Sequence, residues 1–436
     1  MTAVGARVCV IGAGPSGIAA AKNLRDAGLS VVVYDRGREV GGNWVFDDSA
    51  KHSSVFETTH IISSKRFSQY ADYPMPDHYP DYPSHKLLAE YFQGYARRFE
   101  LYPHIQFETS VLRCEKTPGE RWAVTAARGE QTETTLFDAL VVANGHHSVP
   151  RYPQYPGMYS GDLSHSHDYK RAEPFRGKRV LVIGGGNSAC DVAVETARVA
   201  ASTDLSWRRG YWIVPKFLFG QPVDYIHHVI DKRLGFLPTS TRLRALEKVL
   251  RLLNGRNAGY GLPEPDHHLG ETHPTLNSEL LYFIRHGEIR ARPDIARYDG
   301  KTVHFTDGRA AEYDAIVACT GYIIAHSFFH PAFIDFRAGP VPLYLKMLHA
   351  DHPTLFFVGL FQPLGCIWPG AELQAKLAAR MLTGQWSPPQ DLRGAITREL
   401  HHPDVAQLDS PRHTITVEAN AFHRRLHREL ASASRS

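Results

Sequence analysis

The chain has 436 residues, of which 43% are hydrophobic, and a formal net charge of +4. This length predicts two or three globular domains with sizeable cores, and the small, dispersed charge argues against nucleic-acid binding. No apolar run approaches the roughly 20 residues of a membrane helix, and a strand expected near the start leaves no room for a secretory signal. We therefore expect a cytoplasmic protein without a membrane span.

The cysteines limit the redox chemistry that the chain can perform. The five of them show no Cys-x-x-Cys pair and no zinc-type spacing: positions 9, 114, 190, 319 and 366. We expect reduced, mostly structural thiols. A flavoprotein disulfide reductase is excluded because it needs a closely spaced dithiol beside its flavin.

The first motif follows a predicted buried strand at residues 8–11. A glycine fingerprint comes next, formed by Gly12, Gly14, Ser16 and Gly17. Such a strand-to-helix turn leaves backbone N–H groups and the positive end of a helix facing a pyrophosphate. A second strand, predicted at residues 29–34, ends at Asp35, where a carboxylate can accept hydrogen bonds from a ribose diol.

A second copy of this pattern begins in the middle of the chain. A buried strand is predicted at residues 180–183, and the fingerprint after it contains Gly184, Gly186, Asn187, Ser188 and Ala189. The following strand leads to Arg208 and Arg209 in place of an acid. Arginine suits a ribose 2′-phosphate, so this site favours NADP(H) over NAD(H). The alternative is two solvated surface arginines.

An internal repeat supports the duplication. Residues 137–145 resemble residues 313–321, and the distance from each fingerprint to its repeat is similar, 145 − 12 = 133 against 321 − 184 = 137. We predict an α/β fold with two Rossmann-like dinucleotide-binding domains, the second inserted into a discontinuous first. The expected boundaries are 1–169, 170–320 and 321–436, with a helical insertion at about 215–280 that includes a helical patch at 242–253.

The 25 histidines suggest no metal site. The densest group, His267-His268-x-x-Glu271-x-His273, lies among prolines and glycines that favour a loop over a metal-binding helix. No nucleophile elbow indicates hydrolase chemistry.

Between the fingerprints, Tyr159-x-Gly161-x-x-x-His165-x-x-x-Tyr169 resembles the signature of the flavin-containing monooxygenases, with tyrosine in place of the leading phenylalanine. Other stretches resemble the same family: Gly41-Gly42-Asn43-Trp44, Asp72-Tyr73-Pro74-Met75-Pro76, Ser206-Trp207-Arg208-Arg209-Gly210, His273-Pro274-Thr275-Leu276-Asn277, Cys319-Thr320-Gly321-Tyr322, Gly359-Leu360-Phe361-Gln362-Pro363-Leu364-Gly365 and, more weakly, residues 410–414.

The resemblance implies FAD at the first fingerprint and NADPH at the second. It implies that NADPH reduces FAD and that the reduced flavin captures dioxygen as a 4a-hydroperoxide. One oxygen then passes to a soft nitrogen or sulfur nucleophile, such as a small amine or sulfide. A homodimer is also implied. Besides the fingerprint residues, the implied cofactor contacts are Gly42, Asn43, Trp44, Gln362 and Thr320.

The signature residues His165 and Tyr169 are implied to link the domains and order the nicotinamide, with a purely structural role as the alternative. One departure stands out. Ile62 occupies the position where many members carry a flavin-contacting asparagine. Isoleucine cannot donate that hydrogen bond, so Ser63, His60 or bound NADP⁺ replaces it, or more hydrogen peroxide leaks. A Baeyer–Villiger monooxygenase and an NADPH oxidase or flavin reductase remain alternatives, as does a non-enzymatic nucleotide sensor.

Overall fold

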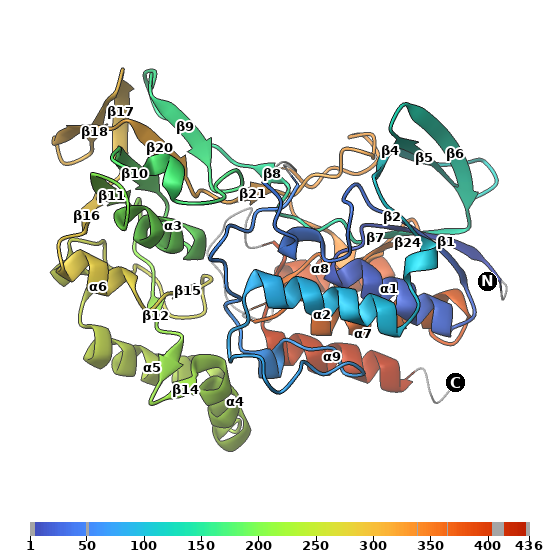
Figure 1. Ribbon diagram of the computed structural model, residues 1–436. Coiled ribbons are helices and arrows are strands. Elements are labelled where there is room, and N and C mark those ends of the chain that lie inside the picture. The colour runs from blue at the N-terminus through green and yellow to red at the C-terminus, as the bar shows by residue number, and fades with distance from the viewer. Residues whose placement is uncertain (1–4, 49–51, 338, 364, 403–413, 433–436) are drawn as a thin grey trace. The chain divides into compact units, whose positions relative to one another are not determined.

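A computed structural model describes residues 5–48, 52–337, 339–363, 365–402 and 414–432. The chain divides into two compact units (Figure 1). Unit 1 comprises Met1–Ser53, Ser63–Val149 and Ile323–Ser436, and unit 2 comprises Ser54–Ile62 and Pro150–Tyr322. Leu364 and residues 410–413, which belong to two of the stretches noted above, lie outside the described residues.

Unit 1 is built on a seven-stranded sheet. In spatial order its strands are β22 (Leu343–Tyr344), β23 (Leu348–His349), β24 (Leu355–Phe357), β7 (Ala139–Val142), β1 (Arg7–Ile11), β2 (Ser30–Tyr34) and β3 (Ile105–Gln106). From β24 to β3 all neighbours are parallel. The central strands β1 and β7 are almost wholly buried, as expected for apolar runs covered on both faces.

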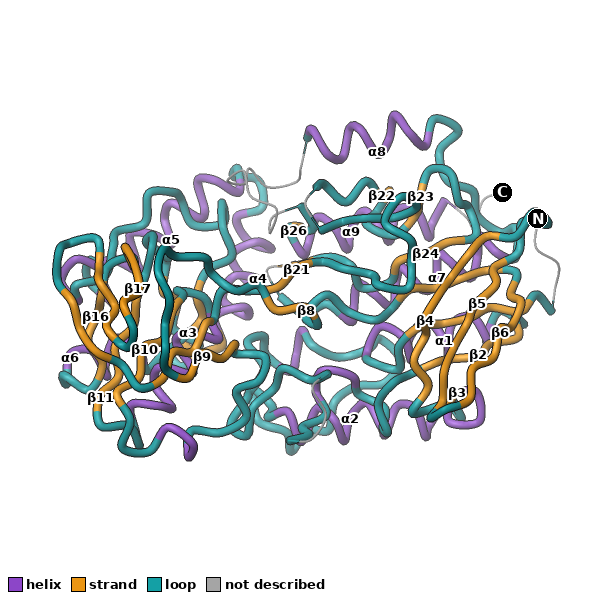
Figure 2. The backbone as a smooth tube through the Cα atoms, turned by 90° about the horizontal axis from the view of Figure 1, so that it is seen from above, coloured by secondary structure: helices purple, strands orange, loops and turns teal. Residues whose placement is uncertain are grey.

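The helices of unit 1 lie around this sheet: α1 (Pro15–Asp26), α2 (His85–Arg98), α7 (Trp368–Leu382), α8 (Leu392–His401) and α9 (Ala419–Ser432), with short 3-10 turns at Gly42–Trp44, Lys65–Phe67 and Tyr102–His104. Helix α7 packs against both α1 and α9 (Figure 1). A separate antiparallel sheet, at the right of Figure 2, contains β4 (Thr109–Lys116), β5 (Trp122–Arg128) and β6 (Gln131–Phe137). The short strands β25 (Gln362–Pro363) and β26 (Thr416–Val417) pair in parallel.

Unit 2 contains a second parallel sheet, in the order β16 (Ile289–Arg292), β11 (Ser202–Ser206), β10 (Arg179–Ile183), β20 (Ala315–Ala318) and β9 (Asp162–His165). Because β9 pairs with β20, residues 150–169 belong to unit 2. The boundary in the structure therefore lies at 149/150, where the sequence led us to expect 169/170. Figure 2 shows this sheet with α3 (Asn187–Ala197) beside it.

The internal repeat is confirmed by the strand register. In unit 1, Val10 of β1 pairs with Val141 of β7, and in unit 2, Val182 of β10 pairs with Val317 of β20. Each repeat therefore lies directly beside the strand that carries its glycine fingerprint. Each also ends in a glycine with a left-handed backbone, Gly145 at φ 71° and Gly321 at φ 84°.

The predicted insertion is helical. It holds α4 (Val223–Leu234) and α5 (Thr239–Asn254), so the predicted patch at 242–253 lies inside α5. The remaining elements of unit 2 are α6 (Leu280–Arg285), β12 (Ile213–Val214), β13 (Phe217–Leu218), β14 (Gln221–Pro222), β15 (Thr275–Leu276), β17 (Ile295–Asp299), β18 (Thr302–Phe305), β19 (Ala310–Glu312) and 3-10 turns at Glu173–Phe175 and Asn257–Tyr260. Strands β8 (Val149–Pro150) and β21 (Tyr322–Ile323) pair with each other.

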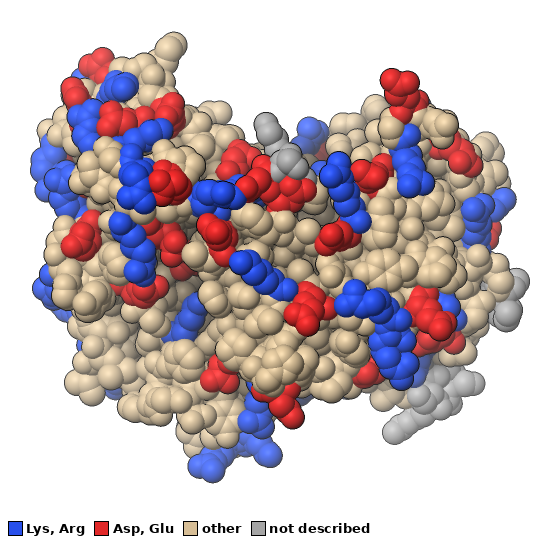
Figure 3. All heavy atoms as spheres, viewed as in Figure 1, with Lys and Arg blue, Asp and Glu red and all other residues tan. Residues whose placement is uncertain are grey.

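The surface in Figure 3 carries basic and acidic side chains interspersed, without one dominant patch of either sign on the face drawn. Within the described residues, no helix has the length and apolar character needed to cross a bilayer. All five cysteines are buried free thiols.

Candidate functional site

The first glycine turn joins β1 to α1 and requires glycine for steric reasons. Gly12 has φ 105°, and a Cβ there would lie 2.7 Å from the carbonyl oxygen of Ala143. A Cβ at Gly17 would lie 1.8 Å from the oxygen of Gly12. Gly14 precedes the helix in extended conformation and offers no side-chain cap. The first N–H groups of α1 therefore suit an anionic ligand such as a pyrophosphate.

A second glycine segment approaches this turn closely. A Cβ at Gly42 would lie 2.9 Å from the Cα of Gly14. The adjoining carbonyl of Asn43 accepts a hydrogen bond from Ser53 at 2.8 Å, and the ring of Trp44 meets that of Trp368 edge to face, with centroids 5.9 Å apart. The three predicted residues from Gly42 to Trp44 thus lie next to the first fingerprint.

Asp35 follows β2, and its carboxylate lies at the glycine turn. It accepts hydrogen bonds from the N–H of Ala13 at 2.5 Å and of Gly37 at 2.6 Å, one on each oxygen. A carboxylate offers about four acceptor positions, so capacity for ribose hydroxyls remains. The Ser16 side chain lies against the backbone of Gly359, where an added Cβ would be 2.1 Å from the Ser16 Oγ. These features fit the adenosine and pyrophosphate part of a dinucleotide.

Gln362 has a partner that sequence reasoning missed. Its Oε1 lies 3.1 Å from Nε2 of His146. An amide oxygen only accepts, so the imidazole donates and the Gln362 amide nitrogen is left as a donor. Burial lowers the pKa of His146, and it lowers the pKa of His326 to about 4. Both rings are therefore neutral at neutral pH. His326 lines a small pocket with Asn144, Gly145 and Gly359, and its Nδ1 has no hydrogen-bond partner among the described residues.

Ile62 and Ser63 are neighbours in the chain, but they fall in different units. Ile62 is half-buried in unit 2. Ser63 is 4% exposed in unit 1 and accepts a hydrogen bond from the Ser68 hydroxyl at 2.8 Å. The Cys366 thiol contacts both serines, although burial raises its pKa and keeps it protonated. No spacing in the sequence indicated this buried serine and cysteine cluster.

The second glycine turn, between β10 and α3, has the same steric logic. Gly184 has φ 130°, and a Cβ there would lie 2.5 Å from the carbonyl oxygen of Cys319 and 3.5 Å from the methyl of Ala189. Ala189 is fully buried and closes the helix against the strand, so its side chain lies within the core. Ser188 is exposed at the first turn of α3, and Gly186 carries no side-chain cap. This turn also suits a pyrophosphate.

Side chains from residues 275–277 hold the second turn in place. Thr275 donates to the carbonyl of Gly185 at 2.6 Å. The Asn187 side-chain oxygen accepts from the Leu276 N–H at 2.7 Å, which uses one of its two acceptor positions and orients the amide nitrogen as a donor. Asn277 donates to Asp191 on α3 at 2.8 Å. The stretch that resembled the family at 273–277 is therefore a support for the glycine turn.

Arg208 and Arg209 follow β11, as predicted. Arg208 is exposed. Arg209 is half-buried and stacks over the ring of Tyr211 at 5.6 Å, while its Nε has no hydrogen-bond partner among the described residues. A buried guanidinium N–H without a partner is costly, so this arrangement fits a phosphate. Thr320 donates its hydroxyl to the carbonyl of Arg151.

The signature residues His165 and Tyr169 are both buried in unit 2. His165 ends β9, accepts the N–H of His167 on Nδ1 at 3.1 Å, and has a pKa lowered to about 4 by burial. Tyr169 is 3% exposed and its pKa is raised by burial. At neutral pH the imidazole and the phenol are therefore uncharged.

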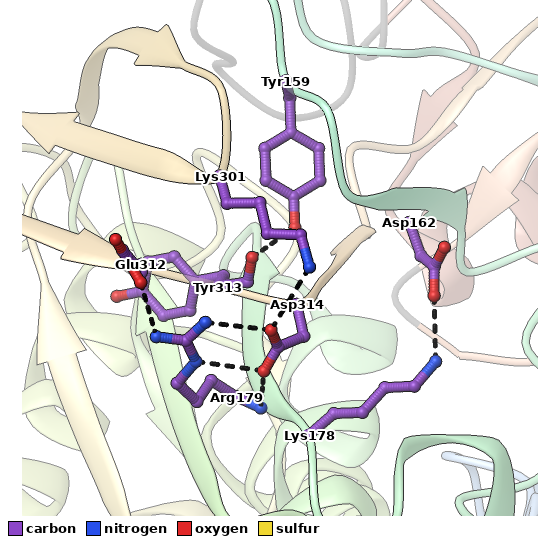
Figure 4. A network of polar contacts seen from close by, with 8 residues as sticks. All are labelled: Tyr159, Asp162, Lys178, Arg179, Lys301, Glu312, Tyr313 and Asp314. Atoms are coloured by element: carbon purple, nitrogen blue, oxygen red, sulfur yellow. Dashed lines mark hydrogen bonds and ion pairs between the residues drawn. The ribbon is translucent and has the colours of Figure 1, made fainter.

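The beginning of the signature has a packing explanation. Tyr159 donates to the carbonyl of Tyr313 at 3.0 Å (Figure 4). A Cβ at Gly161 would lie 2.4 Å from the Tyr159 hydroxyl, so the spacing of these two residues is a steric requirement. Nearby, Arg179 forms an ion pair with Asp314 at 2.9 Å and lowers the pKa of that carboxyl. Because this network lies where β10 and β20 begin, at the opposite ends from the glycine turn, it supports the fold.

Histidines in the stretch at 267–273 form hydrogen bonds with nearby side chains. His267 bonds Thr272 at 2.8 Å through Nε2, and His268 lies 3.2 Å from Glu247. Across the part of the chain that the structure describes, there is no group of three or more His, Cys, Asp or Glu side chains that could hold a metal ion.

Two sheets with parallel central strands, each followed by a glycine turn, define a mixed α/β protein of the two-dinucleotide class. The flavin-binding monooxygenase-like family model matches residues 5–409, and the chain belongs to that family. It is an FAD- and NADPH-dependent monooxygenase, with dioxygen and a small molecule as substrates.

Curated relatives match most of the chain. Flavin-containing monooxygenase 5 of Oryctolagus cuniculus is 35% identical over 431 residues, which is 94% of this chain and 80% of the relative. Dimethylaniline monooxygenase [N-oxide-forming] 2 of Mus musculus is 34% identical over 402 residues, 88% of this chain and 75% of the relative.

Solved structures share the fold. The S-allyl-L-cysteine S-oxygenase of Allium sativum superposes with a TM-score of 0.72 at 22% identity, covering 98% of this chain and 89% of the other. The cyclohexanone monooxygenase of Rhodococcus sp. Phi1 bound to NADP⁺ superposes with a TM-score of 0.72 at 17% identity, covering 99% of this chain and 98% of the other.

Proposed function

We propose that the enzyme transfers one oxygen atom from dioxygen to a soft nitrogen or sulfur nucleophile, such as a tertiary amine or a thioether. The observation that carries this proposal is the relationship to an N-oxide-forming monooxygenase over 88% of the chain at 34% identity. The S-oxygenating structural neighbour from Allium sativum supports the sulfur branch.

We propose further that FAD binds at the first glycine turn and NADPH at the second. The support is the contrast at the ribose end, where Asp35 suits free hydroxyls and Arg208 with Arg209 suits a 2′-phosphate. The contacts assigned to FAD are Gly12, Gly14, Ser16, Gly17, Asp35, Gly42, Asn43, Trp44 and Gln362; those assigned to NADPH are Gly184, Gly186, Asn187, Ser188, Ala189, Arg208, Arg209 and Thr320. Gly12, Gly17 and Ala189 act here through backbone and packing.

The bound flavin supplies the redox and oxygen-transfer chemistry. The chain contributes orientation and exclusion of water. His146 holds the Gln362 side chain through its amide oxygen, so the amide nitrogen would be a donor available to the flavin. Ile62, beside Ser63, contributes an apolar side chain. This side chain excludes water but donates no hydrogen bond. We assign His165 and Tyr169 to ordering the nicotinamide half of NADPH, with uncharged side chains, because burial lowers the pKa of the imidazole and raises that of the phenol.

The test is purification followed by an absorbance spectrum, and then oxidation of NADPH and of NADH with a panel of tertiary amines and sulfides. We expect a yellow protein that prefers NADPH and gives N-oxides or sulfoxides, identified by mass spectrometry. Flavin-loaded protein that oxidises NADPH without forming any oxygenated product would contradict the proposal.

A Baeyer–Villiger activity is the second candidate, because cyclohexanone monooxygenase shares the fold at a TM-score of 0.74. Lactone or ester formation from ketones, in the absence of sulfoxidation, would select it. The tyrosine at position 169 argues the other way, since such enzymes usually carry tryptophan there.

Ile62 supplies the reason to measure hydrogen peroxide as well. We expect Ile62→Asn to lower the peroxide formed per NADPH oxidised, because an amide restores a hydrogen bond worth about 1 kcal/mol, roughly fivefold. Ile62→Val, which keeps the site apolar, is the control. Equal peroxide yields in the native enzyme and Ile62→Asn would count against this role.

We also propose that the enzyme forms a homodimer, on the family resemblance, and that it acts in the cytoplasm, because the sequence has no apolar run of membrane-helix length. Light scattering of the purified enzyme measures the mass and tests the dimer, and fractionation of cells tests the compartment.

A further inference from the structure

The segment Ser54–Ile62, called the strap here, belongs to unit 2 although the residues on both sides of it belong to unit 1. Its apolar anchor is Phe56, which is 8% exposed and forms part of a hydrophobic core of unit 2. The Phe56 ring meets the Tyr169 ring edge to face, with centroids 5.4 Å apart. Packing of this kind stabilises the strap on unit 2.

Lys170 hydrogen-bonds the strap on both sides of this anchor. Its carbonyl accepts the N–H of Glu57 at 2.9 Å. Its Nζ donates to the carbonyl of Val55 at 3.5 Å and to that of His167 at 3.2 Å. The strap also closes a turn of its own, in which the Phe56 N–H donates to the Thr59 hydroxyl at 2.9 Å. The backbone on both sides of Phe56 is thereby fixed to residues 167–170.

The strap ends at Ile62, which is covalently joined to Ser63 of unit 1. These are the two residues that we assigned to the flavin side. We propose that Phe56, Tyr169 and Lys170 are positioning residues, which hold the strap on unit 2 and thereby set the backbone at Ile62 and Ser63. This inference rests on the proposed function, and it gives the end of the family signature a role in coupling NADPH oxidation to oxygen transfer.

Tyr169 acts here through its ring. Its hydroxyl is buried and has no hydrogen-bond partner among the described residues. The ring lies between Phe56 and Phe175, whose centroid is 5.6 Å away. Phenylalanine at position 169 would keep both ring contacts, whereas alanine would remove them. This pair of variants separates packing from hydroxyl chemistry.

The experiment measures release of the strap and coupling in the same purified holoenzyme. A glutamate-specific protease cleaves after the exposed Glu57 only when the strap detaches, and mass spectrometry identifies the fragment 1–57. The variants are Lys170→Met, Tyr169→Ala and Tyr169→Phe. Lys178→Met is the matched control, because Lys178 forms an exposed ion pair with Asp162 elsewhere in unit 2 (Figure 4).

We expect cleavage after Glu57 to be about tenfold faster in Lys170→Met, since hydrogen bonds from a charged donor are lost. Tyr169→Ala should be faster still, and both should form at least about twofold more peroxide per NADPH. Lys178→Met should match the native enzyme in both measurements, and Tyr169→Phe, which keeps both ring contacts, should match it in the cleavage rate.

Two results would overturn the inference. One is unchanged cleavage in both Lys170→Met and Tyr169→Ala, which would mean that these residues do not hold the strap. The other is faster cleavage with unchanged peroxide yield, which would mean that the strap does not position the site. Failure of the proposed function has a different signature, because the native enzyme would then form no oxygenated product while the cleavage rates remained measurable.

Discussion

The two glycine turns of this enzyme share one backbone plan but are supported differently. In unit 1 the turn is approached by other glycine backbones, at Gly42 and Gly359. In unit 2 it is held by polar side chains, with Thr275 bonded to Gly185 and Asn187 bonded to Leu276. A backbone contact tolerates no side chain at all, whereas a side-chain contact can be weakened in small steps. Substitutions at these supporting contacts should therefore act abruptly in unit 1 and gradually in unit 2.

The largest effect is expected at Gly17. Alanine there would place its Cβ 1.8 Å from the oxygen of Gly12, which the turn cannot accommodate. We expect Gly17→Ala to abolish FAD binding or folding, measured as flavin absorbance per protein. Gly28→Ala is the control, because Gly28 also has a positive φ of 80° but meets nothing within 4 Å. It should lose only about 1–2 kcal/mol of stability and remain yellow. A yellow Gly17→Ala enzyme would refute the steric argument.

The next largest effect is expected at Arg209, which we assigned to the 2′-phosphate of NADPH. Arg209→Met keeps an apolar stem against Tyr211 but removes the guanidinium. We expect KM for NADPH to rise about tenfold to about a hundredfold, because one or two charge-assisted hydrogen bonds are lost, while KM for NADH stays unchanged. Arg285→Met is the matched control, because Arg285 also stacks on a tyrosine of unit 2, Tyr260, at 4.3 Å from the ring centroid. Equal losses with both nucleotides would contradict the assignment of Arg209 to the 2′-phosphate.

A smaller effect is expected from the side-chain support of the second turn. Thr275→Val removes the hydrogen bond to Gly185 and preserves the shape of the residue. Loss of about 1 kcal/mol predicts a roughly fivefold weaker affinity for NADP⁺, measured by calorimetry, with FAD content unchanged. Thr302→Val, in the separate sheet of β17, β18 and β19, serves as the control. A change in FAD content would show that the two turns are not independent.

The last effect concerns the dependence of stability on pH. Burial raises the pKa of Asp191 from 3.8 to about 6, against the opposing influence of Lys216 and the hydrogen bond from Asn277. A carboxyl whose pKa is raised by folding stabilises the native state when it is protonated, so this contribution is lost as pH rises from about 4 to about 6. Asp191→Asn should flatten this part of the stability profile in urea unfolding. An identical profile in the variant and the native enzyme would argue against a raised pKa.

The local pattern of the sequence was enough to predict much of the fold. Short apolar runs predicted β1 and β10, and the glycines after them predicted the turns, because a continuous buried strand and a left-handed turn are decided by neighbouring residues. The repeat at 137–145 and 313–321 likewise predicted two strands with equivalent partners. Asp35 and Arg209 could be placed because a strand end determines where the next side chains lie.

Contacts between distant parts of the chain could not be predicted in this way. The pair of His146 and Gln362 joins residues far apart in sequence, and so does Asp204, which is buried and accepts hydrogen bonds from Arg290, Arg292 and Tyr313. The boundary at 149/150 depends on the pairing of β9 with β20. Each of these features depends on which surfaces meet after folding, and the spacing of neighbouring residues does not predict that.

The sequence by itself determined the two glycine turns and the acid or arginines that follow the next strand after each turn, because backbone sterics and strand periodicity act over a few residues. Only the tertiary structure decided that the strap packs on unit 2 through Phe56, Tyr169 and Lys170. The physical reason is burial of an aromatic ring in a core that contains residues 56, 169, 180, 182, 189 and 190, with residue 175 packed against it. These residues are brought together only when the chain folds.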